Sequence, residues 1–405
     1  MQSERSPVLS VSSLEQRHDQ QTVSVKDMDF ELVKPSLPRS PLAMSSVESL
    51  PFSRQSPGDD SASIISSAKS LRQPSTDQTH PEINSAQPPD PTDIAAHRQR
   101  ELRWISTMSS VSASQARKSR KVRKLVLEGV PASVRYLVWA HLTDSKAKRL
   151  DGLYPRLCQR QRVASFADIE RDAARIFSEQ PLQKQSLVNV LQSYLSMVPD
   201  VQYCTGLAAI TGQLLVQSPE EDAFWTLVSM MDIHLRPLFS PQSVRLDVDA
   251  SLFAKTLESL DAPLARRIFV DMALPPVSIC KHWFTSLFVD TLPTEYLHRA
   301  WDVFLFEGVS FMIRMGLALI SCRRTLLLQA VDRERTISLL GERSTQGLPP
   351  TPDALIELAL SLKVNDDDLR KQRAKLEAQV KRQTQSRANP AALPRGSVSI
   401  SLPKA

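Results

Sequence analysis

Glycine, cysteine and the usual nucleotide- and metal-binding motifs are scarce or missing in this sequence. Only ten glycines and four cysteines occur among 405 residues. No alternating apolar run is flanked by Asn-Gly or Asp-Gly, so a β-barrel or β-sandwich is not expected. A glycine-rich phosphate loop, an HExxH motif and a GxSxG motif are all absent, and the seven histidines are scattered. We therefore expect no nucleotide site, no metal and no cofactor on the chain itself.

The cysteines and the apolar stretches indicate a protein of the cytoplasm. No two cysteines form a CxxC pair, and the N-terminus carries no secretory signal, so free thiols in a reducing compartment are expected. Residues 311–328 are apolar but contain three arginines, which is typical of a buried helix and not of a membrane span. We expect a cytoplasmic protein that reaches endomembranes peripherally, through its partner.

Composition divides the chain into a polar leader and an apolar centre. The first hundred residues hold 11 of the 28 prolines and twenty serines, whereas all five tryptophans lie between Trp104 and Trp301. The leader cannot bury enough apolar surface to offset its chain entropy, and its Ser-Pro pairs at 6–7, 40–41 and 56–57 match the minimal motif of proline-directed kinases. The sequence predicts a disordered leader over 1–95, a globular domain over 96–335, a linker over 336–350, a helical segment over 351–383 and a disordered tail over 384–405.

Apolar residues recur at helical spacing through the centre, and turn residues separate the periodic stretches. Gly129 and Pro131 end one helix and start the next. The segment Ser218-Pro219-Glu220-Glu221 matches a capping box. We predict an all-α fold with helices from about 97, over about 122–127, 134–142, 166–177, 185–197, 203–216, from 219, and over 248–260, 264–272, 283–288, 295–306, 309–328, 352–362 and 369–383.

The densest group of positive charge is Arg117-Lys118-Ser119-Arg120-Lys121-Val122-Arg123-Lys124. One interpretation is a contact with acidic lipid or nucleic acid. The other is the solvated face of a surface helix, because Val122 and Val126 continue a helical apolar spacing through the group. The second is favoured, since the net charge is only +6 and the other positive residues are spread along the chain. We expect no nucleic-acid partner.

A helical segment from Ile169 to Arg175 carries a carboxylate and a guanidinium on one face. Asp172 and Arg175 are three residues apart, which makes them neighbours on a helix surface. Ile169 and Ala173 mark the buried face. Asp172 can therefore hold or orient the Arg175 guanidinium. Taken alone, such a pair is usually a solvated ion pair that contributes little to stability.

Two further segments have equally ordinary readings when taken alone. Tyr203-Cys204-Thr205-Gly206 places a glycine at the start of a helix, where the backbone or phosphate of a partner can approach closely. Arg299-Ala300-Trp301-Asp302, followed by Glu307-Gly308, is typical of a core helix with a buried tryptophan and a glycine at its end.

In this order and at these separations, the three segments resemble the TBC domain of Rab GTPase-activating proteins. The resemblance covers about residues 100–335, and each motif alone is weak whereas the ordered set is specific. Its motifs are Gly129-Val130-Pro131 with Val134-Arg135 and Val138-Trp139, the arginine-finger motif Ile169-x-x-Asp172-x-x-Arg175, Glu221-Asp222-Ala223-Phe224-Trp225, Trp283-Phe284, Leu292-Pro293 and Arg299-x-Trp301-Asp302. The resemblance implies a multi-helix, all-α TBC domain.

The resemblance also implies an activity in vesicle trafficking. The chain would stimulate GTP hydrolysis on a Rab-family small GTPase in its GTP-bound state, with no nucleotide site of its own. Hydrolysis develops charge on the transferring phosphoryl group, and a guanidinium supplied by a second protein stabilises that charge. Arg175 would be that arginine finger, and Asp172 would help to position it. The resemblance gives supporting roles to Ile169, Asp172, Tyr203, Gly206, Arg299, Trp301 and Asp302.

One position departs from the pattern of the family. The family usually has Tyr-x-Gln-Gly, whose glutamine positions the attacking water, and here Thr205 stands in its place. A hydroxyl cannot present the fixed donor and acceptor of an amide together. Three interpretations follow: the GTPase's own glutamine orients the water, or the activity is weak and the domain is mainly a Rab-binding scaffold, or Gln202 or Gln213 substitutes. The retained Arg175 and Asp172 favour the first.

Overall fold

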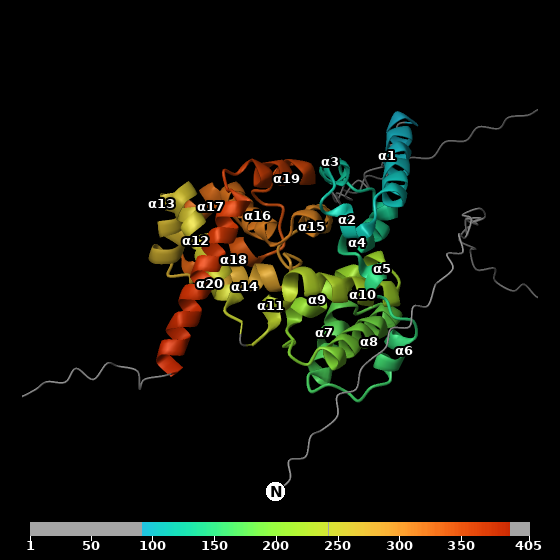
Figure 1. Cartoon of the computed structure of the whole chain (residues 1–405). Helices are drawn as coiled ribbons and strands as arrows, with labels where there is room; N and C mark the ends of the chain where they lie inside the picture. The colour runs from blue at the N-terminus through green and yellow to red at the C-terminus, as the bar shows by residue number, and fades with distance from the viewer. Residues whose placement is uncertain (1–90, 242, 389–405) are drawn as a thin grey trace, which may run out of the picture. The chain divides into compact units, whose positions relative to one another are not determined.

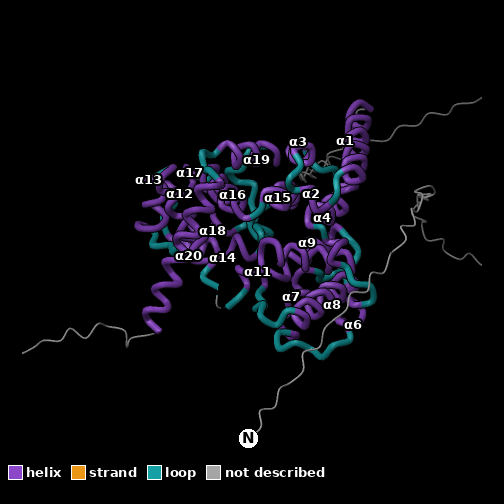
Figure 2. Tube along the Cα trace, viewed as in Figure 1, coloured by secondary structure: helices purple, strands orange, loops and turns teal. Residues whose placement is uncertain are grey.

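Helices make up every regular element in the computed structural model, which describes residues 91–241 and 243–388 (Figures 1 and 2). No strand occurs within these ranges. The predicted all-α fold is confirmed. Most of the predicted leader, with its three Ser-Pro pairs, and the end of the predicted tail lie outside the described residues.

The first helices of the domain surround the Gly-Val-Pro segment. They are α1 (Pro91–Ser110), α2 (Ala113–Ala116), α3 (Arg120–Glu128), the 3-10 turn η1 (Ala132–Val134), α4 (Arg135–Thr143), α5 (Ser145–Lys148) and α6 (Leu153–Cys158). Gly129 ends α3 with a φ of 107°, a conformation that glycine adopts without a steric penalty. Helix α1 packs on α3 and α4, and the Trp104 indole donates to the Gly129 carbonyl at 3.1 Å.

The second group of helices carries two of the three motifs. It consists of α7 (Phe166–Ile176), α8 (Pro181–Met197), α9 (Thr205–Gln217), α10 (Glu220–Met230), the π-helical turn η2 (Met231–Leu235) and α11 (Arg236–Phe239). Helix α8 packs against α6, α7, α9 and α10, and its residues from Leu187 to Leu195 are almost all buried. Since α7 and α9 also contact each other, the two motifs are held together by a common core.

The remaining helices form the third group. They are α12 (Arg245–Leu260), α13 (Ala262–Arg266), the π-helical turn η3 (Arg267–Asp271), α14 (Pro276–Thr285), α15 (Thr294–Glu307), α16 (Val309–Cys322), α17 (Arg324–Gln329), α18 (Arg333–Gly341), α19 (Pro352–Ser361) and α20 (Asp366–Ala388). Helix α19 packs on α15 and α16, and α20 packs on α12 and α16. Both C-terminal helices therefore belong to the same packed unit as the motifs.

Buried tryptophans fix the centre of the domain. Trp104, Trp139, Trp283 and Trp301 are each at most 1% exposed. Their indole N–H groups all donate, to the Gly129 carbonyl, Asp302 Oδ1, the Leu340 carbonyl and the Leu287 carbonyl respectively. A buried indole without an acceptor would cost free energy, so these four bonds tie the tryptophans to particular neighbours. The predicted burial of Trp301 is confirmed.

Several boundaries drawn from the sequence fall inside helices. Helix α1 begins at Pro91, within the predicted leader, and α18 runs from Arg333 through Gly341, across the predicted start of the linker. The cause of the second difference is a side-chain cap, because Asp332 accepts from the Arg335 backbone N–H at 2.7 Å. Helix α20 likewise extends to Ala388, past the predicted start of the tail. The division of the chain into leader, domain, linker, helical segment and tail stays a prediction.

The predicted capping box at Ser218 is wrong. Helix α10 begins at Glu220, but the Ser218 hydroxyl makes no cap on it and donates to the Leu214 carbonyl at 2.9 Å. Only Ser218 and Pro219 separate α9 from α10. The Leu214 carbonyl thus accepts from both the hydroxyl and the backbone N–H of Ser218, which closes the end of α9, and Pro219 stands at the N-cap position of α10.

Two other helices have different bounds from those predicted, each for one reason. The helix expected over 283–288 starts earlier, at Pro276, and ends at Thr285, because Leu287 and Phe288 adopt positive φ angles of 47° and 64°. The helix expected over 309–328 is divided at Arg323. The Arg323 side chain is buried, and its guanidinium donates to carbonyls of the chain between α18 and α19 and of α18 itself.

Candidate functional site

Helix α7 buries one side of the arginine-finger motif and exposes the other. Ile169 and Ala173 are fully buried, and Asp172 is 8% exposed. The Arg175 side chain, by contrast, is 59% exposed. The spacing explains this division, because residues at i and i+4 lie on the same face of a helix. The last turn of α7 therefore presents a guanidinium to solvent from a well-anchored helix.

Asp172 connects Arg175 to Tyr203 in the structure. Arg175 Nη2 lies 3.4 Å from Asp172 Oδ1, and the Tyr203 hydroxyl donates to Asp172 Oδ2 at 2.6 Å. Burial, together with this bond to the carboxylate, raises the pKa of Tyr203 well above its ordinary value. Tyr203 is thus a permanent donor, and it holds the carboxylate while the long Arg175 contact leaves the guanidinium free to move.

Thr205 and Gly206 begin α9, after Tyr203 and the N-cap residue Cys204. Thr205 is exposed at the first helical position, and Gly206 is buried against the end of α14. A methyl group at Gly206 would lie 2.7 Å from the Thr285 carbonyl carbon and 3.0 Å from the Ser286 backbone nitrogen. The sequence predicted that this glycine permits a close approach by a partner. Here it permits a close approach by the backbone of the same chain.

Replacing Gly206 with alanine is expected to destabilise the domain. The new methyl group would meet backbone atoms of α14, which cannot move as a flexible side chain can, so α9 must shift. Overpacking of this kind costs roughly 1–3 kcal/mol. The measurement is the free energy of unfolding in urea. Gly341→Ala is the control, since its methyl group would be 3.6 Å from the nearest atom; equal stabilities of the two variants would contradict the prediction.

A groove of about 870 Å³ opens beside Tyr203. It is lined by residues of the α6–α7 loop, the start of α7, the end of α8 and the α8–α9 loop. Arg162 lies over the Phe166 ring at 4.2 Å, and Arg160 donates to the Ser196 carbonyl at 3.1 Å. Asp168 and Gln202 add polar groups to the same lining. Of these residues only Gln202 was named from the sequence, although the Arg160-Gln161-Arg162 run is a local signal of a basic loop.

The two glutamines near the motif have different surroundings. Gln213 Oε1 lies 3.1 Å from His298 Nε2 on α15, so its amide is engaged with that helix. The Gln202 side chain is exposed, and its backbone N–H donates to the Phe239 carbonyl at 2.9 Å. These contacts give no support to a substitution of Thr205 by Gln213. Gln202 lines the groove but lies on the opposite side of Tyr203 in sequence.

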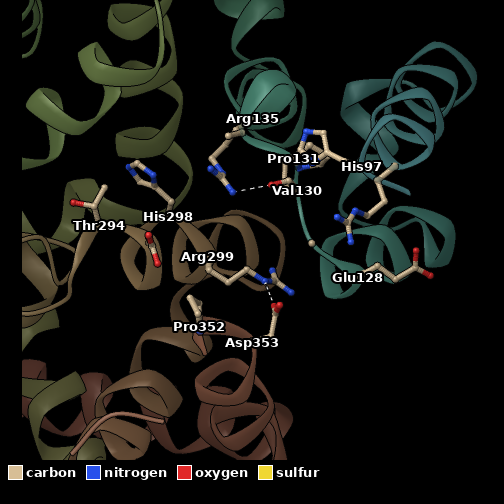
Figure 3. A pocket seen from close by; sticks show the side chains of 14 residues that line it. His97, Glu128, Val130, Pro131, Arg135, Thr294, His298, Arg299, Pro352 and Asp353 are labelled. Atoms are coloured by element: carbon tan, nitrogen blue, oxygen red, sulfur yellow. Dashed lines mark hydrogen bonds and ion pairs between the residues drawn. The ribbon is translucent and has the colours of Figure 1, made fainter. Parts of the chain in front are cut away.

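The third motif holds α15 to the start of the domain. Arg299 donates to the Val126 and Leu127 carbonyls at 2.8 Å each and pairs with Asp353 at 2.5 Å. Figure 3 shows Arg299 and Asp353 pointing toward each other across a pocket of about 370 Å³ between α1, α3, α4, α15 and α19. Asp353 was not selected from the sequence, because its partner lies 54 residues away.

Asp302 is a fully buried carboxylate at the centre of this third motif. Its Oδ1 accepts from Trp139 Nε1 at 2.8 Å and from Arg135 Nε at 3.3 Å, and its Oδ2 has no partner among the described residues. Arg135 also donates to the Val130 carbonyl, a bond drawn in Figure 3. Among the residues that the structure covers, hydrogen bonds join Arg299, Trp301 and Asp302 to α3, α4, α19 and the α14–α15 loop, and not to Arg175 or Thr205.

The stability contribution of Asp302 is expected to depend on pH. Burial raises its pKa from 3.8 to about 6, against the opposing effect of Arg135. The folded state therefore binds this proton more tightly than the unfolded state does. The stabilisation is full below about pH 4 and is lost as the pH rises through 6. We expect the unfolding free energy of the wild type, minus that of Asp302→Asn, to fall by roughly 2–3 kcal/mol from pH 4 to pH 7.

The same difference for the exposed residue Asp247 serves as the control for this measurement. Asp247 lies in the first turn of α12, and Asp247→Asn removes one carboxylate from the surface of the domain instead of from its interior. A constant difference for Asp302→Asn would mean that the buried carboxylate is ionised throughout, held by Arg135.

No cluster of metal-ligating side chains occurs in the part of the chain that the structure describes. Over the same residues, no helix is long and apolar enough to span a membrane. The cysteines within these ranges are free thiols. The polar groups that contact one another around Tyr203 are the Arg175 guanidinium, the Asp172 carboxylate and the Tyr203 phenol.

Comparisons with known proteins find domains that are similar to this one. Residues 132–328 match the model of the Rab-GTPase-TBC domain. The chain is 30% identical over 246 residues to TBC1 domain family member 10B of Mus musculus, which covers 58% of this chain and 30% of that protein. It is 30% identical over 253 residues to the Rab GTPase-activating protein eat-17 of Caenorhabditis elegans, covering 60% of this chain and 28% of that one. The chain thus spans about a third of the length of these curated relatives.

Solved structures show the same fold. The TBC domain of the Chlamydomonas flagellar RabGAP superposes with a TM-score of 0.55 at 22% identity, covering 67% of this chain and 93% of that one. The Ypt/Rab-GAP domain of Gyp1p superposes with a TM-score of 0.52 at 16% identity, covering 65% and 97% respectively. The described part of this chain therefore has the all-helical fold of these TBC domains, and its residues 132–328 match the Rab-GTPase-TBC model.

Proposed function

We propose that this chain is a GTPase-activating protein for a Rab-family small GTPase in its GTP-bound state, and that Arg175 is its arginine finger. The observation that carries the proposal is the arrangement of Arg175, Asp172 and Tyr203. An exposed guanidinium stands in the last turn of a helix that is buried along one side, and its carboxylate neighbour accepts a hydrogen bond from a half-buried phenol. A surface ion pair that only contributed to solubility would need no such support.

The chemistry of GTP hydrolysis gives this arrangement its purpose. Negative charge develops on the transferring phosphoryl group and on the leaving oxygen, and a positively charged group inserted by a second protein stabilises it. A guanidinium can donate to two oxygens at once, in one plane. The 3.4 Å separation from Asp172 leaves Arg175 able to exchange a weak intramolecular contact for a strong contact with phosphate.

The comparisons support the identity of the partner. One relative bears the name Rab GTPase-activating protein eat-17, and the matching family model is that of the Rab-GTPase-TBC domain. The sequence has no phosphate-binding loop of its own. We infer that the nucleotide is bound by the GTPase, and that this chain contributes side chains to a site completed only in the complex.

Because position 205 is a threonine, we infer that the GTPase itself positions the attacking water. Its exposed side chain stands at the start of α9, beside Tyr203, where a glutamine would present an amide. Because a threonine hydroxyl is shorter and cannot offer a fixed donor and acceptor together, the GTPase's own glutamine is the group that orients the attacking water in this proposal.

A second candidate function rests on the same residue. Without a glutamine at 205, the domain is also suited to bind a GTP-loaded GTPase as a scaffold, with little or no effect on hydrolysis. This alternative predicts binding that depends on the nucleotide state and a hydrolysis rate that does not change. It shares the docking surface of the main proposal and differs only in the rate.

The decisive experiment is single-turnover GTP hydrolysis on a panel of purified, GTP-loaded Rab GTPases, with and without the full-length chain. The main proposal expects acceleration for at least one member of the panel. Binding of the same GTPases, loaded with GDP or with a non-hydrolysable GTP analogue, is measured in parallel. State-dependent binding without acceleration would support the scaffold, and the absence of both would refute both proposals.

A further inference from the structure

Helix α1 exposes a row of aliphatic side chains. Ile94, Leu102 and Ile105 are 54%, 60% and 47% exposed, and spacings of eight and three residues place them on one side of the helix. The opposite side is buried through Trp104 and Thr107. Scattered exposed leucines need no explanation, but these three aliphatic residues share one side of a packed helix, with Arg98 between Ile94 and Leu102.

The segment that contains this row also carries the positive charge of the protein. Residues 91–128 include nine lysines and arginines and three acidic residues, a net charge of +6, which equals the net charge of the whole chain. The rest of the sequence is therefore neutral as a whole. Positive charge gathered in this way creates a local field that the modest total conceals.

Helix α3 divides this segment into a buried and a charged side. Val122 and Val126 are at most 1% exposed, which confirms that the basic group lies on a surface helix. Lys118 and Lys121 are exposed, and the Lys124 side chain is 79% exposed. The apolar spacing that favoured a solvated helix is the same property that turns the lysines outward.

One member of the apolar row and two of the lysines meet at a groove. A hollow of about 340 Å³ runs between α1 and α3, and Leu102, Lys121 and Lys124 all line it. Arg103 and Glu128 close the same groove with an ion pair at 2.7 Å. The groove connects the two features, and we call the surface around it the α1–α3 face. Leu102, Lys121 and Lys124 of this face line the groove, and Ile94, Ile105 and Lys118 are its other members.

We propose that the α1–α3 face binds the surface of a membrane that contains anionic lipids. Lysines attract the negative headgroups at a distance, and an aliphatic row enters the boundary between headgroups and acyl chains. Neither feature alone would hold a protein at the surface for long. Together they supply the two signals that stable peripheral binding requires. This direct contact goes beyond the proposed action on a Rab GTPase and does not depend on it.

The chemistry of the face favours lipid over nucleic acid. Proteins that bind single strands stack bases on aromatic side chains, and the only aromatic residue between 91 and 128 is Trp104, which is buried. Exposed isoleucine and leucine side chains make no favourable contact with a phosphate backbone. The same side chains can insert into a bilayer, where each buried methylene makes the binding free energy more favourable.

The test is sedimentation of the full-length chain with vesicles of phosphatidylcholine alone or with three parts in ten of phosphatidylserine. Binding is expected only to the anionic vesicles, and it should weaken as salt is raised. The triple variant Lys118→Gln, Lys121→Gln, Lys124→Gln should lower the partition coefficient about 100-fold, at roughly fivefold for each charge. Its matched control removes three exposed lysines elsewhere, Lys255→Gln, Lys371→Gln and Lys375→Gln, and should change partition much less.

A second variant tests the apolar row independently of charge. Leu102→Ser with Ile105→Ser should lower partition about tenfold or more at unchanged net charge. Thermal melting shows whether each variant is folded. Equal binding to neutral and anionic vesicles, or no loss in the triple lysine variant, would overturn the proposal. So would a face whose lysines bind soluble polyglutamate or a random DNA duplex but not the vesicles.

The vesicle experiment and the GTP-hydrolysis experiment test the two proposals separately. Hydrolysis on a soluble GTPase without vesicles should be the same for the wild type and for the triple lysine variant, because the α1–α3 face contains none of the residues placed at the nucleotide. Vesicle binding without any stimulation of a GTPase would leave this inference standing and refute the other.

Discussion

Replacing Arg175 with alanine is expected to lower the stimulated rate of GTP hydrolysis on the target GTPase by about 10³-fold or more, the share that arginine fingers supply. The guanidinium acts on charge that develops only in the transition state. Binding of the GTP-loaded partner should therefore change little, while the rate constant falls. The measurement is single-turnover hydrolysis at saturating concentration of the variant, which separates the rate from the affinity.

The helix provides a matched control for this variant. Arg171 is one turn earlier on α7, its side chain is 75% exposed, and it pairs with Asp168 at 2.8 Å three residues away. Arg171→Ala removes the same charge from the same helix, so it should leave most of the stimulation in place. Arg175→Lys keeps the charge but not the planar pair of donors, and it should behave more like alanine than like arginine. Equal rates for Arg175→Ala and wild type would exclude the finger.

The local part of this site could be predicted from the sequence, because it depends on helix periodicity. The spacing placed Ile169 and Ala173 on the buried face and Arg175 outside it, and the structure agrees. It grouped Asp172 with Arg175, whereas Asp172 is only 8% exposed. The fold class followed from the same periodicity and from the lack of strand signals. Even the contact of Asp172 with Arg175 is a three-residue relation that a helix imposes.

The long-range part could not be predicted, because no periodic pattern reports it. The bond from Tyr203 to Asp172 joins residues 31 apart, and the pair of Arg299 and Asp353 joins residues 54 apart. The space at Gly206 is decided by Thr285, on a helix far along the chain. The sequence indicated that this glycine permits a close approach, but we expected the approach from a partner protein. The backbone that fills the space belongs to a distant segment of the same chain, which the local sequence does not report.

Helix ends were the least predictable local feature, for a related reason. Ser218 matched a capping box in sequence, yet its hydroxyl serves the preceding helix. A serine between two helices can satisfy either the free carbonyls of one or the free N–H groups of the other. Which it does depends on how closely the helices follow each other, and that is set by the packing of α9 and α10 on α8.

Changing the catalytic glutamine of the GTPase to leucine is expected to remove stimulation by the wild-type chain, by at least about 10²-fold, since a misplaced nucleophile costs a factor of this order. The reason lies at Thr205. In a complex with a glutamine at that position, an amide from the activating protein could hold the water, and the leucine substitution on the GTPase would be tolerated. This chain offers only an exposed hydroxyl there, so the water has no second amide to bind.

The Thr205→Gln variant of this chain, assayed on the leucine form of the GTPase, tests the same explanation in the opposite direction. The variant should restore at least tenfold of the lost stimulation on the leucine form of the GTPase, because a glutamine side chain at the start of α9 supplies the missing donor and acceptor. Thr205→Ala, which shortens the side chain without adding an amide, should match the wild type on both forms. If the wild-type chain remains fully active on the leucine form, the water is held by this chain after all. Gln202 would then be the residue to change next, because it alone of the two neighbouring glutamines lines the groove beside Tyr203.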